Sequence, residues 1–338
     1  MKMMFVVLFW LAGSAFGEAI PAMMKAVVVH EYGRPEVARY EDAPMPVPKE
    51  NEVLVRVIAA GVNPADALAV SGKYAKEWGT QLPLIPGYDI AGIVVKVGAA
   101  VTRLKAGDKV YGYPLMGGGW AEYCVVAETD AAVKPNSATY TEAAALPLAA
   151  LTAWQALVDT IRLRSGETIL IQGGSGGVGS LAVQLAKLRG ARVMATASTA
   201  NQELLKQLGA DVAIDYTRQK FEDVAKDVDA VLDTVGGETF MRSCRVVKKG
   251  GIVCTLVGAE RPAGVGQLGI RVTGLWVKPN AEQLGEIAKL IDEKKLKPVV
   301  TEELPLNEGV RALEKAETHH TRGKVVLKVA EEPSKSDE

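Results

Sequence analysis

The sequence predicts an α/β protein of two parts, one rich in β-strands and one in which strands and helices alternate. Short β-branched or alternating runs, separated by Gly, Pro and Asp, recur through residues 25–135. From residue 168 onward, strand-like runs alternate with helix-like stretches, as parallel βαβ units do. A glycine-rich turn joins the first of those strands to the first of those helices.

The first part is expected to form a compact barrel-like or sandwich-like domain, because its strands are short and closely spaced. Strand-like runs lie at 26–29, 53–59, 90–97, 109–111 and 121–126. The pattern changes near Thr141, where a cap followed by strong helix formers predicts the start of a helix at Thr141 itself.

The second part is expected to be a doubly wound parallel sheet with helices on both faces. Its strands are predicted at 168–172, 192–197, 212–214, 230–232 and 251–255, and its helices at 177–189, 201–208, 221–225 and 239–246. After Pro279 the pattern changes again, to a helix, a strand, a helix and a strand at 281–293, 299–303, 307–316 and 324–329. The acidic stretch 331–338 is predicted to be a disordered tail.

Composition excludes some partners. The 338-residue chain has a formal net charge of −1, so it has no basic field to hold a nucleic-acid backbone or an anionic membrane surface. Its three cysteines, Cys124, Cys244 and Cys254, are odd in number and widely spaced, so we expect buried thiols and no disulfide framework.

The N-terminus looks like a signal peptide. Lys2 precedes the apolar run 3–12, and Ala15-Phe-Gly17 fits a signal-peptidase site with cleavage before Glu18. The run is too short to span a bilayer as a stable membrane helix. A signal peptide at 1–17 predicts a periplasmic or secreted protein. If translation begins at Met23 or Met24 instead, the protein is cytoplasmic.

The most specific local signal is the turn Gly174-x-Gly176-x-x-Gly179, between an apolar strand and an amphipathic helix. Glycines at this spacing permit a tight turn, let the backbone approach a pyrophosphate and allow close helix–strand packing. The helix N-terminus adds free N–H groups and a positive dipole end. We therefore predict a dinucleotide site, with Gly176, Gly177 and Val178 against the pyrophosphate.

The second strand of this unit favours NADPH over NADH. An NAD site usually has an Asp or Glu about 20 residues after the motif, bound to the ribose hydroxyls. Here that strand ends in Ala197-Ser198, and the first carboxylate is Glu203. An acidic group there would repel a 2′-phosphate, whereas Ser198 and Asn201 can donate hydrogen bonds to one. Lys206 is a further candidate to bind that phosphate through its positive charge. Alternatively, it only lies on the exposed face of a helix.

Several separated segments resemble the medium-chain dehydrogenase/reductase superfamily, most closely its zinc-independent quinone oxidoreductase and enone reductase branch. The resemblance covers residues 24–329 and rests on the sequences at 24–33, 61–66, 85–92, 143–147, 151–155, 208–211 and 320–324. It implies a GroES-like catalytic domain of residues 24–145 and 290–330, with a Rossmann NADP-binding domain of residues 146–289 inserted. It also implies a homodimer, commonly formed through an edge of the Rossmann sheet.

The same resemblance argues against a metal. Zinc alcohol dehydrogenases of this superfamily have Cys where Asn63 stands and His-Glu where Tyr88-Asp89 stands. Three scattered cysteines and three histidines do not supply tetrahedral zinc ligands, and His319 and His320 are expected in a surface turn. Without a metal to polarise a carbonyl, unactivated alcohols are poor substrates, whereas quinones and α,β-unsaturated carbonyls are already electrophilic.

By resemblance, the substrate pocket lies between the domains and is lined by the catalytic candidates Asn63, Asp66, Tyr74 and Tyr88. Asn63 is expected to donate an amide hydrogen bond to the substrate oxygen, and Tyr74 or Tyr88 a phenolic one. The alternative for Tyr88 is packing in a buried strand, and for Asp66 it is capping the helix that follows. The remaining cofactor contacts that we expect are Thr152, Tyr216, Val235, Gly236, Val257, Gly258 and Lys324.

The sequence thus favours an enzyme that transfers hydride from NADPH to a quinone or an enone. Two alternatives stay open: an alcohol dehydrogenase, and a protein that binds NADPH without turnover.

Overall fold

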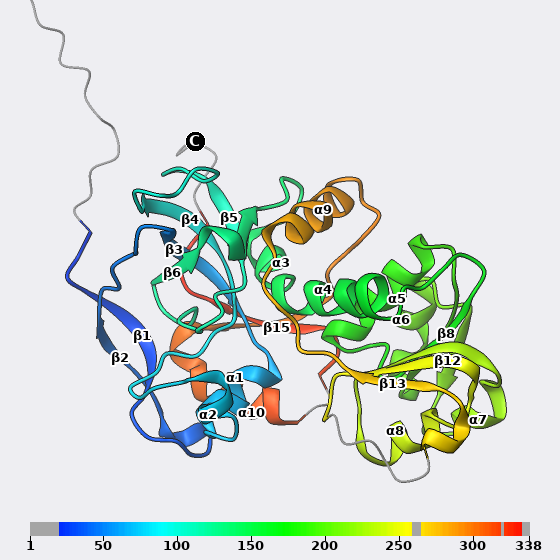
Figure 1. The fold of residues 1–338 in the computed structure, drawn as a ribbon. Coiled ribbons are helices and arrows are strands. Elements are labelled where there is room, and N and C mark those ends of the chain that lie inside the picture. The colour runs from blue at the N-terminus through cyan, green and yellow to red at the C-terminus, as the bar shows by residue number, and fades with distance from the viewer. Residues whose placement is uncertain (1–19, 259–264, 319–320, 333–338) are drawn as a thin grey trace, which may run out of the picture.

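The computed structural model describes residues 20–258, 265–318 and 321–332. The molecule contains two large sheets, and both are visible in Figure 1 with strand β15 (Lys324–Lys328) near the middle. The predicted signal peptide at residues 1–17 lies outside the described residues, and so does the predicted surface turn at His319 and His320. The same holds for residues 333–338 of the predicted tail. Within the predicted tail, residues 331 and 332 are described, and the carboxylate of Glu332 accepts a hydrogen bond from Tyr140 N at 2.8 Å.

The first large sheet has seven strands in a mixed arrangement. Their order is β14-β15-β3-β4-β5-β7, and β6 pairs with β3. Two of the strands, β14 (Val300–Pro305) and β15, come from the end of the chain and join strands from its beginning. The other strands are β3 (Glu52–Gly61), β4 (Asp89–Val97), β5 (Lys109–Gly112), β6 (Tyr123–Ala127) and β7 (Ala131–Val133).

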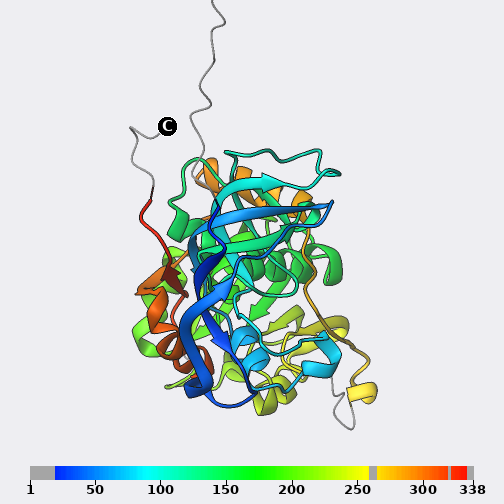
Figure 2. The same ribbon diagram turned by 90° about the vertical axis from the view of Figure 1, so that its left-hand side faces the viewer.

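A two-stranded antiparallel ribbon of β1 (Met23–Val29) and β2 (Ala38–Pro44) covers one side of this sheet. Figure 2 shows these two blue strands on the face turned toward the viewer. Short helices α1 (Pro64–Val70) and α2 (Ala75–Trp78) follow β3, and α10 (Gly309–Glu317) packs against α1. The sequence did not predict β2 or α2, because their hydrophobic periodicity is too short to recognise, and it placed a helix after Asp66, whereas α1 already begins at Pro64.

The second sheet is fully parallel, with the order β10-β9-β8-β11-β12-β13. This order reverses direction next to β8 (Thr168–Ile171), and ligands bind at such a point in open α/β sheets. The other strands are β9 (Arg192–Ala197), β10 (Val212–Asp215), β11 (Val228–Asp233), β12 (Val247–Thr255) and β13 (Arg271–Gly274). The helices between them are α5 (Gly177–Leu188), α6 (Gln202–Gln207), α7 (Phe221–Val224) and α8 (Gly237–Ser243).

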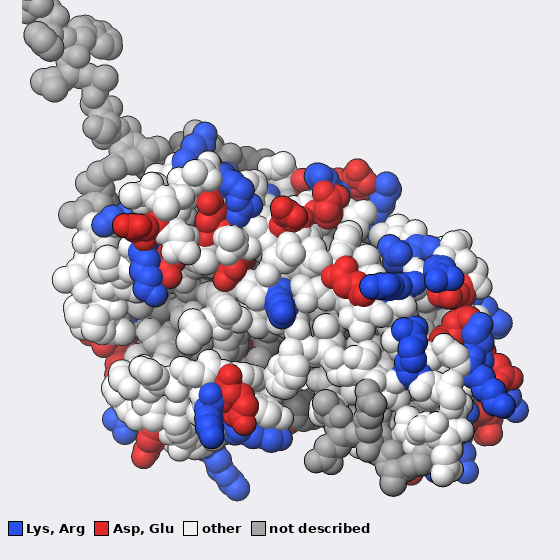
Figure 3. Space-filling model, viewed as in Figure 1, with Lys and Arg blue, Asp and Glu red and all other residues white. Residues whose placement is uncertain are grey.

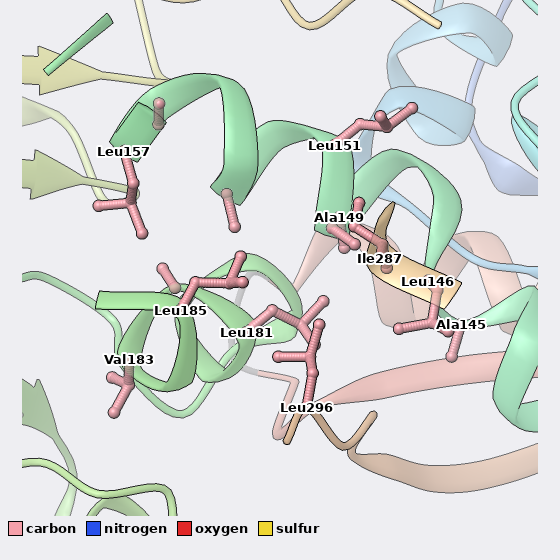
Figure 4. Packing of buried hydrophobic residues seen from close by; sticks show 14 of the residues in the cluster. Ala145, Leu146, Ala149, Leu151, Leu157, Leu181, Val183, Leu185, Ile287 and Leu296 are labelled. Carbon is pink, nitrogen blue, oxygen red and sulfur yellow. The ribbon is translucent and has the colours of Figure 1, made fainter. Parts of the chain in front are cut away.

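A helical layer joins the two sheets. It consists of α3 (Tyr140–Ala144), α4 (Pro147–Trp154), a π-helical turn at Gln155–Thr160, and α9 (Ala281–Asp292). Figure 4 shows Leu151, Leu181 and Leu296 among the buried side chains around α4 and α5. One apolar cluster therefore runs through both halves, which holds the two sheets in a fixed relation.

The helix start near Thr141 was predicted two residues too late. Thr139, not Thr141, is the N-cap of α3, and its hydroxyl accepts from Glu142 N at 3.1 Å. The Glu142 carboxylate reaches back to Thr139 N at 3.0 Å and completes a capping box. The Thr-x-x-Glu spacing of residues 139–142 identifies this cap, whereas the prediction relied on the alanines that follow.

Candidate active site

The glycine-rich turn after β8 is shaped by close backbone approaches. A Cβ at Gly179 would lie 2.2 Å from the carbonyl oxygen of Gly173, and one at Gly174 would lie 2.8 Å from Ala195 Cβ. Neither neighbour has room to yield, because the first is backbone and the second belongs to the buried strand β9. These contacts explain why the turn needs glycine at both positions.

The start of α5 is an open anion site. Its N-cap is Gly176, which has an extended backbone and provides no side-chain cap. Gly176 has no side chain, so the N-cap residue offers no side-chain oxygen to the N–H groups of the first turn, from Gly177 and Val178 onward. A helix of 12 residues with such an end suits a pyrophosphate, so the residues present fit a dinucleotide.

The turns after β11 and β12 lie at the same carboxyl edge of the sheet. The buried carboxylate of Asp233 accepts from the N–H groups of Val235 at 3.1 Å and Gly236 at 3.0 Å. Its other oxygen accepts from the Thr255 hydroxyl at 2.8 Å and so fixes β11 to β12. Val235 and Val257 are left half exposed at this edge, where the sequence predicted cofactor contacts.

The region beyond β9 has hydroxyl, amide and guanidinium groups. Asn201 Nδ2 donates to Ser198 Oγ at 3.3 Å, and Tyr216 is half exposed after β10. Lys206 pairs with Glu203 at 3.5 Å on an exposed helix face, which fits the alternative given for it. The sequence interpretation missed Arg218, whose largely exposed side chain follows β10 and approaches Asp215 at 3.8 Å.

Asp215 is a carboxylate close to this region, but its oxygens are already occupied. They accept from the hydroxyls of Thr199 and Thr217, both at 2.6 Å. These hydrogen bonds lower the pKa of Asp215. Asp215 therefore stays ionised, and the guanidinium of Arg218 partly balances its charge.

A buried polar cluster lies where the two halves meet. Lys324 Nζ donates to Asn63 Oδ1 at 2.5 Å and to Asp89 Oδ2 at 2.9 Å. Asn63 Nδ2 donates to the same Asp89 oxygen at 2.8 Å, and all three side chains are buried. The other Asp89 oxygen accepts from Leu148 N at 2.6 Å, at the start of α4. We call Asn63, Asp89 and Lys324 the polar cluster.

The polar cluster lies against the glycine-rich turn at residues 173–179, which we call the nucleotide turn. Gly323 N donates to Ser175 O at 2.8 Å, and a β-bridge pairs Gly176 with Gly323. A Cβ at Gly177 would lie 2.9 Å from Lys324 Cδ, so the lysine stem passes against the start of α5. Lys324 thus lies between the predicted cofactor site and the predicted catalytic residues.

The side chains of Asn63 and Asp66 make structural hydrogen bonds that the sequence did not predict. One Asn63 amide N–H is used by Asp89, so its donation to a substrate stays a prediction that depends on the second N–H. Both Asp66 oxygens accept backbone N–H groups, from Asn63 at 2.7 Å and Gly87 at 2.8 Å. This geometry favours the capping alternative for Asp66. Complete burial raises the pKa of Asp66 to about 7, although the backbone hydrogen bonds oppose the rise.

Aromatic rings surround the cluster on the catalytic side. Tyr88 is buried, and burial together with the Asp66 carboxylate raises the pKa of its phenol. The predicted Tyr74 is half buried and stacks on Trp78 with ring centroids 5.3 Å apart. The sequence missed Tyr113 and Trp276, which lie next to these rings. The predicted Thr152 is buried in α4, where its hydroxyl donates to Leu148 O at 2.6 Å.

The three cysteines are free and buried, as predicted. Burial raises the pKa of the Cys124 and Cys254 thiols to about 12 and that of Cys244 to about 11, so none is poised to react as a thiolate. In the described part of the chain, no three His, Cys, Asp or Glu side chains are grouped as a metal site requires.

Charged side chains of both signs share the surface. Figure 3 shows basic and acidic side chains interspersed over one face. None of the described helices is long and apolar enough to cross a bilayer.

Comparison with known proteins connects this geometry to a family. Residues 49–136 match the alcohol dehydrogenase GroES-like domain, and residues 208–327 match the zinc-binding dehydrogenase model. A 2-methylene-furan-3-one reductase of Solanum lycopersicum is 42% identical over 91% of this chain and 80% of its own. The chain belongs to the medium-chain dehydrogenase/reductase superfamily. Within it, the chain falls in the zinc-independent quinone oxidoreductase branch.

Two further members of the superfamily support this placement. An NADPH-dependent alkenal/one oxidoreductase of Arabidopsis thaliana chloroplasts is also 42% identical, over 91% of this chain and 80% of its own. The structure of the quinone oxidoreductase from Coxiella burnetii superimposes with a TM-score of 0.86 at 37% identity, covering 91% of this chain and 99% of that one. The predicted family and the GroES-like and Rossmann fold class are confirmed.

Proposed function

We propose that the protein is an NADPH-dependent oxidoreductase that reduces the conjugated double bond of an enone, or a quinone, without a metal ion. The observation that carries this proposal is the contact between the nucleotide turn and the polar cluster through Gly323 and Lys324. The names of the tomato, Arabidopsis and Coxiella relatives point to the same reaction class.

The cofactor would be held by the residues that line the carboxyl edge of the parallel sheet. Gly176, Gly177 and Val178 offer N–H groups to the pyrophosphate. Ser198, Asn201 and Arg218 offer donors to a 2′-phosphate, and this set favours NADPH over NADH. When bound, the nicotinamide supplies the hydride for the reaction.

Lys324 is the group that we assign to the developing negative charge. Reduction of an enone places a hydride on the β carbon, negative charge on the oxygen and then a proton on the α carbon. An ammonium has three N–H bonds, and two of those at Lys324 are used by Asn63 and Asp89. The third remains to donate to the acceptor oxygen, where a fixed donor in a buried site stabilises charge strongly.

The neighbouring groups keep that lysine in place. Asp89 and Asn63 orient the ammonium, while the Asp89 contact with Leu148 fixes the pair to α4. A divalent cation facing Asp89 would meet this ammonium and be repelled. Tyr88, whose phenol pKa is raised by burial, stays protonated and is a second hydrogen-bond donor on the substrate side.

One assay separates the three candidate functions. NADPH oxidation is followed with alkenals, alkenones, quinones and, in the reverse direction with NADP⁺, alcohols. We expect turnover with conjugated carbonyls or quinones. Turnover confined to alcohols would favour an alcohol dehydrogenase, and NADPH binding without turnover of any acceptor would favour a binding protein. Either result would overturn the proposal.

For the assembly we propose a homodimer through the edge strand β13. Among the described residues this strand pairs with β12 alone, so its other edge offers backbone donors and acceptors to a second copy. A hollow of about 520 Å³, away from the polar cluster, lies along it and is lined in part by Thr160, Val265 and Val272. Sedimentation at micromolar concentration should give twice the mass of one chain, and a monomer would refute the assembly.

For the location we propose export, directed by residues 1–17. The described chain starts at Ile20 and β1 at Met23, so cleavage before Glu18 leaves every described residue in place. N-terminal sequencing of the native protein should find Glu18. A start at Met23 or Met24 would instead indicate a cytoplasmic enzyme.

A further inference from the structure

Five aromatic rings form a continuous row beside the polar cluster. Their order is Tyr113, Tyr88, Trp78, Tyr74 and Trp276, and Trp276 also contacts Trp78. The centroids of contacting rings are 5.3–6.2 Å apart. One pair is stacked and the others meet edge to face. We call this set the aromatic row.

The inner end of the row reaches the polar groups of the site. Tyr88 directly precedes Asp89 of the polar cluster, and both Tyr88 and Tyr113 are buried. The carboxylate of Asp66 contributes to the raised phenol pKa of both tyrosines, so these rings lie within electrostatic reach of it. A ligand lying along the row can therefore have one end at the chemistry.

The outer end of the row comes from the other half of the molecule. Trp276 follows β13 of the parallel sheet, whereas Tyr74 and Trp78 belong to α2 and its N-cap, on the catalytic side. Trp276 is 64% exposed although it contacts two rings. A tryptophan that only held the two halves together would bury most of its surface, since burial is what makes such a contact favourable.

We propose that the aromatic row is the acceptor-binding wall, and that it selects acceptors that carry a flat ring, such as an aryl-substituted enone, over short-chain alkyl enones. The inference rests on the proposed function and names its substrate class. The exposed indole of Trp276 and the Tyr74 ring pack against the substrate ring, while the carbonyl lies at Lys324 and Tyr88. A short alkyl chain gains little from these rings, because it offers no π face and little area.

The test uses two methyl ketones with the same reacting enone. In 4-phenyl-3-buten-2-one the β carbon carries a phenyl group, and in 3-penten-2-one it carries a methyl group. We expect the wild-type protein to reduce both and to favour the phenyl ketone in kcat/KM. Trp276→Ala should lower kcat/KM for the phenyl ketone about tenfold, mainly through KM, and change that for the methyl ketone by less than about twofold.

Two variants make the result specific. Trp276→Phe keeps a ring and should retain most of the preference. Tyr40→Ala removes an exposed ring on β2, outside the row, and should change neither substrate. Circular dichroism and thermal melting establish that each variant is folded.

The kinetic results distinguish failure of this inference from failure of the proposed function. An equal loss for both ketones in Trp276→Ala would show that the row only holds the two halves together, and no loss for either ketone would show that the wall lies elsewhere. Either refutes this inference and leaves the proposed function standing. If the wild-type protein reduces no enone and no quinone, the proposed function fails and this inference fails with it.

Discussion

The nucleotide turn and the polar cluster are in contact, but the first is formed by backbone groups and the second by side chains. The turn is made of backbone, with five glycines between residues 173 and 179 and no side-chain cap at the start of α5. The polar cluster is made of buried side chains that satisfy one another, from Asn63, Asp89 and Lys324. The turn is therefore sensitive to any added atom, whereas the cluster is sensitive to any lost one.

The largest effect is expected in the polar cluster. Lys324→Met should lower kcat by about 100- to 1000-fold, the range found when a fixed donor to a developing oxyanion is removed. Lys328→Met, the same change at an exposed position of the same strand, should have little effect. Steady-state kinetics with NADPH and an enone measures both.

A companion variant separates chemistry from folding. Lys324→Met alone leaves the buried Asp89 carboxylate without its cation, which costs about 3–5 kcal/mol of unfolding free energy. Adding Asp89→Asn removes that charge, so the double variant should recover stability in urea unfolding but not turnover. Recovery of turnover would show that Lys324 matters only for folding.

The next effect is expected in the nucleotide turn. Gly179→Ala places a methyl group 2.2 Å from Gly173 O and must push α5 away from β8. A displacement of about 1 Å costs about 100-fold in rate, so kcat/KM for NADPH should fall by that order. Gly285→Ala, in α9 where a Cβ meets nothing within 4 Å, is the matched control and should leave kinetics unchanged. Equal kinetics in the two variants would contradict the assigned site.

A smaller effect is expected where the cofactor phosphate is recognised. Arg218→Ala should raise KM for NADPH about tenfold and leave KM for NADH unchanged, since one charge-assisted hydrogen bond is worth about 1.5–3 kcal/mol at most. Arg245→Ala removes another exposed arginine of the same domain as the control. A loss shared by both cofactors would mean that Arg218 acts on folding rather than on the phosphate.

The smallest effect on turnover is expected at Asp66, where the readout is stability against pH. Its pKa rises from 3.8 to about 7 on folding, so the folded state holds this proton more tightly than the unfolded state does. The contribution of Asp66 is therefore full below about pH 4 and is lost as the pH rises to about 7.

Asp66→Asn removes that titration. Its free energy of unfolding should fall less than that of the wild type between pH 4 and pH 7, measured by urea unfolding. At pH 4 the free energy of unfolding of the variant should be about 1–3 kcal/mol lower than that of the wild type. The reason is that the amide nitrogen of Asn cannot accept a hydrogen bond from one of the two backbone N–H groups. Asp223→Asn, at an exposed carboxylate, should keep the wild-type slope.

The difference between the two regions also explains what the sequence could predict. The glycine spacing and the βαβ alternation are local signals, so the strand at 192–197 was predicted with its observed bounds and the start of α5 was predicted at Gly177. β13 was missed because four residues on a sheet edge carry little periodicity.

The site was harder to predict from side chains alone. Asn63 and Lys324 were each expected at the site, but the sequence shows nothing of their hydrogen bond or of Asp89 as their shared partner. Trp276 lies in a segment without helix or strand, where no pattern distinguishes an exposed site residue from an ordinary loop residue. Only the packing of α2 against that segment reveals it.

The bond between Lys324 and Asn63 joins residues that are 261 positions apart, with the whole parallel sheet between them in the chain. During synthesis, the early strands must therefore wait with β3 unpaired on the edge that β15 later covers. Until the segment with Gly323 and Lys324 has been made, the polar cluster and the β-bridge to Gly176 are both incomplete. The proposed site is therefore assembled only once β15 has paired with β3.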